Sequence, residues 1–177
     1  MSWSNQQSAP ISHETALIIN DKTFAFSDEI TVAISGTEQL HIKTGSKDVL
    51  IKFAEVSAIA TECEITGWSC STLTDDGTLN TIQPINMRCR GDETVASSVS
   101  VYHTPTVSDL GTRMSLDVAV GTTIAGGGGG RVAPASGGLS GQFLLTKNSS
   151  NIFQIVNRDA SSATNAVVKM RWTEDEI

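Results

Sequence analysis

Short runs of alternating apolar and polar residues recur from about residue 30 to the C-terminus, and they restrict the fold more than any other feature. In residues 113–120 the alternation has no exception, with Met114, Leu116, Val118 and Val120 on one side of the pattern. Successive side chains of a β-strand point to opposite faces, so each such run predicts a strand with one buried face. Eight to ten runs of this kind predict an all-β fold, a jelly-roll-like antiparallel β-sandwich.

Three runs show which side chains are expected inside. Ile30, Val32 and Ile34 share one face of a first strand, and Val49, Ile51 and Phe53 form the inward face of another. Near the C-terminus, Ala166, Val168, Met170 and Trp172 share one face of the last strand. These residues are the predicted core.

Turn residues predict how the strands are joined. Asp75-Asp76-Gly77 separates residues 62–73 from 78–90, and Asp-Gly between β-like runs predicts a hairpin because glycine tolerates a positive φ. Pro105 should end the strand that contains residues 99–103 or place that strand at the edge of a sheet. The runs 151–157 and 165–173, joined by a polar turn at 158–162, predict a C-terminal hairpin.

The chain of 177 residues is long enough for one buried core, and we expect one domain. Residues 1–16 are polar, contain Pro10 and lack periodicity, so they predict a flexible N-terminal arm. Residues 17–177 would form the β-sandwich. Within it, the glycine-rich stretch 121–141 predicts a long loop, because it has too little apolar area to offset the entropy lost on ordering.

Charge and hydropathy narrow the possible partners. A net charge of -7 would repel a phosphate backbone, so we expect no nucleic-acid partner. No run approaches the ~18 apolar residues of a membrane span, and the first residues lack a secretory signal, so we expect no membrane partner and synthesis in a cytosol. Cys63, Cys70 and Cys89 match no metal or disulfide spacing and are expected to be reduced.

No constellation of reactive side chains is visible. His13, His41 and His103 are far apart and fit no zinc spacing, and no GxSxG elbow is present. The glycines before Arg131 lack the helix and the Lys-Ser/Thr pair of a phosphate loop. Asp75-Asp76 lacks the alternating oxygen ligands of a calcium loop. The expectation is therefore a protein that is not an enzyme and has no cofactor and no metal.

Several short segments resemble small virion structural proteins of tailed bacteriophages. They are residues 99–107 (VSVYHTPTV), Gly111-Thr112 with the later glycine-rich stretch, and a C-terminal part formed by 143–148 (FLLTKN), 151–157 (NIFQIVN) and a last strand ending near Trp172. The resemblance covers residues 64–177. It implies a β-sandwich that binds the outer surface of the head as a decoration or cement protein and stabilises contacts between capsomers.

The same resemblance implies a virion location on the capsid surface, after synthesis in the host cytoplasm. The implied partners are the major capsid protein and the chain itself, as a homodimer or homotrimer. Partner binding is expected at Trp3, Pro10 and Ile11 in the arm and at Arg131 in the loop. The alternative is a tail or tail-fibre component whose β-sandwich binds a receptor or a glycan.

Overall fold

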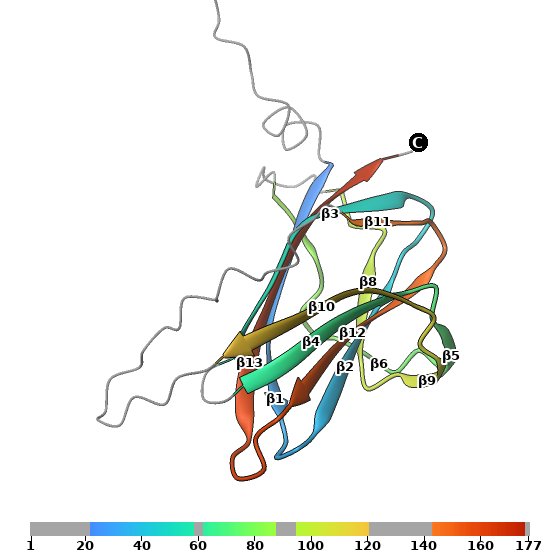
Figure 1. Cartoon of the computed structure of the whole chain (residues 1–177). Helices are drawn as coiled ribbons and strands as arrows, with labels where there is room; N and C mark the ends of the chain where they lie inside the picture. The colour runs from blue at the N-terminus through green and yellow to red at the C-terminus, as the bar shows by residue number, and fades with distance from the viewer. Residues whose placement is uncertain (1–21, 59–61, 88–94, 121–142, 176–177) are drawn as a thin grey trace, which may run out of the picture.

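In a computed structural model, the chain is described over residues 22–58, 62–87, 95–120 and 143–175. These residues form β-strands and connecting turns, with no helix among them, so the all-β prediction is confirmed (Figure 1). The strands are β1 (Thr23–Val32), β2 (Thr37–Lys43), β3 (Asp48–Ala58), β4 (Glu62–Ser69), β5 (Thr72–Asp75), β6 (Thr78–Leu79), β7 (Ile85–Asn86), β8 (Ser100–His103), β9 (Thr106–Asp109), β10 (Thr112–Val120), β11 (Phe143–Leu145), β12 (Ser150–Asn157) and β13 (Thr164–Asp175).

The strands form two antiparallel sheets that pack as a sandwich, with a short ribbon beside them. Sheet A has the order β11-β3-β13-β1-β7, and sheet B has the order β10-β4-β12-β2-β8-β6. The ribbon pairs β5 with β9. The sandwich is therefore observed, whereas the more specific jelly-roll connectivity stays a prediction.

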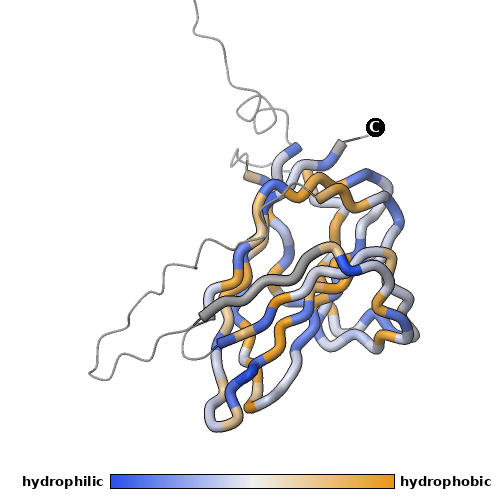
Figure 2. Tube along the Cα trace, in the orientation of Figure 1, coloured by the Kyte–Doolittle hydropathy of each residue, from blue (hydrophilic) through white to orange (hydrophobic). Residues whose placement is uncertain are grey.

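The core lies between the inner faces of the two sheets. As Figure 2 shows, hydrophobic and hydrophilic residues alternate along the strands. The four residues predicted to share one face of the last strand are all buried. The prediction that Ile34 lies in the core with Ile30 and Val32 is wrong, because the strand ends at Val32 and Ile34 is 51% exposed. Phe24 of β1 stacks on Trp172 of β13, with ring centroids 6.4 Å apart. This pair ties two neighbouring strands of sheet A into the core.

The hairpin predicted around Asp75-Asp76-Gly77 is wrong, although its turn is present. Gly77 has φ +91, and the Asp75 carboxylate accepts a hydrogen bond from its N–H at 2.7 Å. The strands on either side pair elsewhere, β5 with β9 and β6 with β8. The residues of a turn determine its local conformation, but β5 and β6 pair with strands from more distant parts of the chain.

The C-terminal hairpin is also wrong, because β12 lies in sheet B and β13 lies in sheet A. Both edges of β12 are occupied, by β2 and by β4, so β13 has to pair elsewhere. The polar connection at 158–162 crosses from one sheet to the other. Asp159 orders it by accepting hydrogen bonds from Ser161 and Ser162, which also lower the pKa of its carboxyl.

Two parts of the predicted organisation lie outside the described residues. These parts are the arm at 1–16 and the loop at 121–141. Residues 17–21, which were predicted to belong to the sandwich, also lie outside the described residues. Pro105 does follow the end of β8, as predicted. Among the described residues, no helix has the length and apolar content needed to cross a membrane.

Candidate docking groove

The outer face of sheet A carries a row of four side chains that crosses four strands. Phe53 of β3 is opposite Arg171 of β13, Arg171 is opposite Ala25 of β1, and Ala25 is opposite Ile85 of β7. Ala25 is the smallest side chain of the row and lies between the larger side chains of Arg171 and Ile85. The sheet thus has a shallow depression on the face that points away from the core.

This depression is a groove of about 470 Å³. Its apolar walls are unusually open to solvent, with Phe53 40%, Ile82 45% and Ile85 64% exposed. The residues that line it are Ala25, Phe26, Ser27, Phe53, Ile82, Gln83, Ile85, Lys169, Met170 and Arg171. Single exposed apolar residues are common, but several around one hollow mark an interaction surface.

A β-bulge turns Phe53 to the outer face. In the pairing of β3 with β13, Ile51 is opposite Trp172 and Phe53 is opposite Arg171, so Lys52 is the extra residue. From this point the inward positions are Ala54 and Val56, which are both buried. The predicted inward position of Phe53 is therefore wrong. A bulge reverses the alternation, and such bulges often redirect a side chain toward a functional surface.

Positive charge flanks the apolar walls of the groove. Lys169 and Arg171 both stand on the outer face of β13, two residues apart, and both line the groove. Lys169 is opposite Ser27 on one side and Glu55 on the other. A partner with apolar side chains and neighbouring carboxylates would match this combination of surfaces.

The outer face of sheet B has a comparable row, but that row is covered. Ile152 of β12 lies between Trp68 of β4 and His41 of β2, and His41 is opposite Tyr102 of β8. Ile152 is 1% exposed and His41 is 0% exposed. The turn after β5 reaches this face, because the Asp76 carbonyl oxygen lies 3.2 Å from His41 Nδ1.

Burial has an electrostatic consequence for His41. Removal from water lowers the pKa of its imidazole, and the nearby Lys43 acts in the same direction. The Asp76 backbone and carboxylate oppose this shift without reversing it. His41 Nε2 has no hydrogen-bond partner among the described residues, and the ring stacks on Tyr102 at 5.3 Å between centroids. We conclude that His41 is a neutral, covered residue of the outer face.

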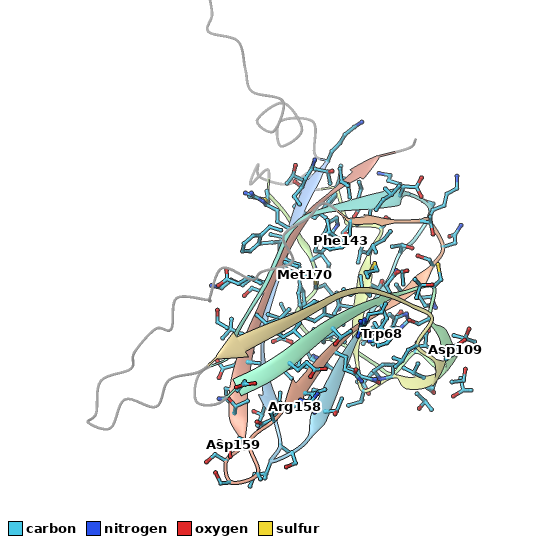
Figure 3. All side chains as sticks on the ribbon, in the orientation of Figure 1. Trp68, Asp109, Phe143, Arg158, Asp159 and Met170 are labelled. Carbon is cyan, nitrogen blue, oxygen red and sulfur yellow. The ribbon has the colours of Figure 1, made fainter. Side chains whose placement is uncertain are left out.

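A second hollow, of about 500 Å³, lies where the ribbon meets sheet B. Trp68 and Gln39 form its floor from the sheet, and residues 107–111 form its rim. Figure 3 labels Trp68 on β4 and Asp109 at the end of β9. The rim is held by Asp109, whose carboxylate accepts the Gly111 N–H at 2.9 Å, and by the Ser71 hydroxyl, which donates to the Leu110 carbonyl at 2.7 Å.

A buried carboxylate connects sheet A to the segment before β8. Glu174 is almost fully buried and accepts hydrogen bonds from the Ser98 N–H, the Ser97 hydroxyl and the Trp172 indole N–H. These hydrogen bonds satisfy the carboxyl oxygens of Glu174 in the interior of the protein. With its partners all inside the protein, Glu174 is a structural residue.

Among the described residues, no group of three or more His, Cys, Asp or Glu side chains could hold a metal ion. His103 Nε2 lies 3.1 Å from an Asp28 carboxylate oxygen, which also accepts a hydrogen bond from Asn80. Cys63 is buried and Cys70 is exposed, and neither forms a disulfide with another described residue. Cys89 lies outside the described residues.

All four predicted partner-binding residues, Trp3, Pro10, Ile11 and Arg131, lie outside the described residues. The groove residues, in contrast, were missed by sequence reasoning. Phe53 continues an alternating run, so the pattern places it inside, and Ile85 was assigned to a hairpin arm. An apolar residue that continues such a run gives no signal of a bulge before it.

Comparisons with protein-family models, with curated proteins and with solved structures find no match to this chain.

Proposed function

We propose that the chain is a non-enzymatic virion structural protein of a tailed bacteriophage, a decoration or cement protein of the head. The groove on sheet A is the observation that supports a binding role. Phe53, Ile82 and Ile85 keep large apolar areas in water, which is unfavourable unless another protein covers them. The resemblance of residues 64–177 to small virion proteins supports the assignment to the phage head.

A cement protein acts by binding the assembled shell better than its separate parts. Binding to one state stabilises that state by mass action, and many copies around a symmetry axis convert weak contacts into high avidity. A compact β-sandwich with an apolar docking groove suits this role because it adds surface contacts without needing a reactive site. In this proposal the protein is made in the host cytoplasm and ends on the outer surface of the head, on the major capsid protein.

The test is to mix the purified protein with expanded heads that lack it, sediment the heads and count the bound copies by gel densitometry. We expect saturation at a fixed multiple of the capsomer number. A few copies per particle, or none, would contradict a cement role and favour a tail component.

The groove variant Phe53→Ser with Ile85→Ser should weaken this attachment. Ile34→Ser is a matched control, because Ile34 is a large, exposed apolar residue beyond the end of β1 and does not line the groove. Equal loss of attachment in both variants would mean that the groove has no special part in binding.

The hollow at Trp68 favours a second candidate, a tail or tail-fibre component that binds a glycan. Sugar rings stack on aromatic faces and exchange hydrogen bonds with polar side chains, and Trp68, Gln39 and Asp109 bring these groups to one hollow. The carboxylate of Asp109 and the net charge of -7 favour a neutral glycan over an anionic one.

A glycan array with the wild type and Trp68→Ala separates the two candidates. The glycan role predicts binding of a defined set of neutral sugars, lost in Trp68→Ala and retained in the ribbon control Thr106→Ala. Absence of binding by the wild type would refute it and leave the head-binding proposal untouched.

A further inference from the structure

We propose that the groove on sheet A binds the N-terminal segment, residues 1–21, of a second copy of this chain. The inference rests on the proposed function and names the partner of its docking surface. Copies of the protein would then be linked by their own N-terminal segments, which would join neighbouring subunits of the decoration layer.

The composition of the segment matches the groove. Residues 1–21 include Trp3, Ile11 and the apolar run 16–19, which can cover Phe53, Ile82 and Ile85. Aromatic and branched side chains of this kind form the anchors of protein interfaces. An apolar groove needs apolar side chains from its partner, and this segment supplies them.

The charges also match. The segment contains Glu14 and Asp21 and has no lysine or arginine. The groove contributes Lys169 and Arg171, both on the outer face of β13. Opposite charges at the edge of an apolar contact fix its register and exclude partners with basic side chains.

The point where the segment ends favours a second copy over the same copy. Lys22 is tied to β13, because its carbonyl oxygen accepts the Glu174 N–H at 2.9 Å. Ala25 in the groove is only three residues further along β1, and the edge of β1 there is occupied by β7. To reach its own groove, the segment would have to turn back past β7. This turn would close a short loop and so reduce the conformational entropy of the chain.

A neighbouring copy avoids this turn. When extended, 21 residues span up to about 70 Å, which is enough to reach another subunit of this size. The contact joins two different surfaces, a segment and a groove, so it can repeat from copy to copy and close into a ring. This geometry suits a dimer or trimer around a symmetry axis of the head.

Self-association without heads is the first experiment. Sedimentation equilibrium of the full chain should show a concentration-dependent oligomer. Deletion of residues 1–12, and separately Phe53→Ser with Ile85→Ser, should each weaken association at least about tenfold, the effect expected on losing one anchor side chain. Ile34→Ser should associate like the wild type, and circular dichroism should confirm that all variants fold. A wild type that stays monomeric would overturn the inference.

The second experiment identifies what occupies the groove. A photo-crosslinking amino acid at position 3 is combined with equal amounts of 14N- and 15N-labelled full chain, and crosslinked peptides are read by mass spectrometry. We expect mixed-isotope crosslinks from position 3 to peptides that contain Phe53 or residues 82–85. Crosslinks only within one isotope would mean that the segment binds the groove of its own copy. Absence of crosslinks to the groove would mean that the segment does not bind there. Either result would overturn the inference.

The two proposals can fail separately. If the chain binds heads at a fixed copy number but forms no mixed crosslinks, the decoration role stands and the groove contacts the capsid protein instead. If mixed crosslinks form but heads bind no protein, the segment exchange stands and the decoration role fails.

Discussion

The outer faces of the two sheets carry similar rows of side chains but differ in what covers them. On sheet B, Ile152 and His41 lie in the middle of the row and are almost completely buried. On sheet A, Phe53 and Ile85 stand at the two ends of the row and remain open to solvent. Both rows lie outside the core, so the hydrophobic effect would favour covering either one.

The difference shows how a sandwich can keep one face for a partner. On sheet B, the turn at Asp76 reaches His41, and residues 107–111 lie around a hollow with Trp68 and Gln39 of the sheet. Among the described residues, no comparable ribbon lies over the groove of sheet A. The covered face of sheet B adds to the stability of the free subunit. The open face of sheet A can form further stabilising contacts only when a partner binds.

The largest expected effect compares the two faces directly. Ile152→Ala should lower the free energy of unfolding by about 2–5 kcal/mol, because it removes a fully buried side chain and leaves a cavity. Phe53→Ala should lower it by less than about 1 kcal/mol, because its ring is already half in water. Urea unfolding of the monomer measures both. Equal losses would mean that the groove is part of the core.

A smaller effect should come from disturbing the cover of sheet B. Gly111 has φ +78, and a Cβ there would lie 2.3 Å from the Ser69 carbonyl oxygen. Gly111→Ala should therefore cost about 1–3 kcal/mol of backbone strain and loosen the ribbon. Hydrogen exchange of the β5 and β9 amides should accelerate, while Thr106→Ala leaves it unchanged. If hydrogen exchange is unchanged in Gly111→Ala, the turn at Gly111 does not contribute to the stability of the ribbon.

Lower pH should destabilise the covered face through His41. Burial keeps its pKa below the ordinary value of 6.5, so the unfolded chain takes up the proton first as the pH falls. Stability from the neutral imidazole is present above pH 6.5 and is lost as the pH falls below it. Lys43, Asp76 and Tyr102 surround the ring and are kept unchanged in the test.

The measurement is the urea midpoint of the wild type and His41→Gln between pH 8 and pH 5. The wild type should lose more stability over this range than the variant, which has no imidazole to protonate. Parallel curves would show that His41 does not sense pH in the folded protein.

The smallest effect concerns the exposed ion pair beside the cover. Lys43 and Asp76 are in contact at the ribbon turn, and the hydrogen bond to Asp76 is the main reason that the pKa of Lys43 is raised. Asp76→Asn should cost only about 0.2–1 kcal/mol, because both side chains are solvated. The difference from the wild type should vanish in about 1 M salt. A difference that persists in high salt would indicate a role beyond charge pairing.

The alternating runs were enough to predict the class of fold and much of the core. Ala166, Val168, Met170 and Trp172 are buried as predicted, because a period of two in a strand depends only on local backbone geometry. The turn at Gly77 was likewise predictable, since its positive φ is a property of a few adjacent residues.

Strand partners and the groove were decided only by the tertiary structure. Asp75-Asp76-Gly77 indicates a turn but does not determine which strands lie beside β5 and β6. Phe53 faces outward because Lys52 is an extra residue relative to β13, more than one hundred residues away in the chain. Local conformation follows from neighbouring residues, whereas pairing, bulges and exposure depend on contacts between distant segments. The sequence by itself therefore determined strands, turns and an inner face, and the packing of the sheets decided which apolar residues stayed open for a partner.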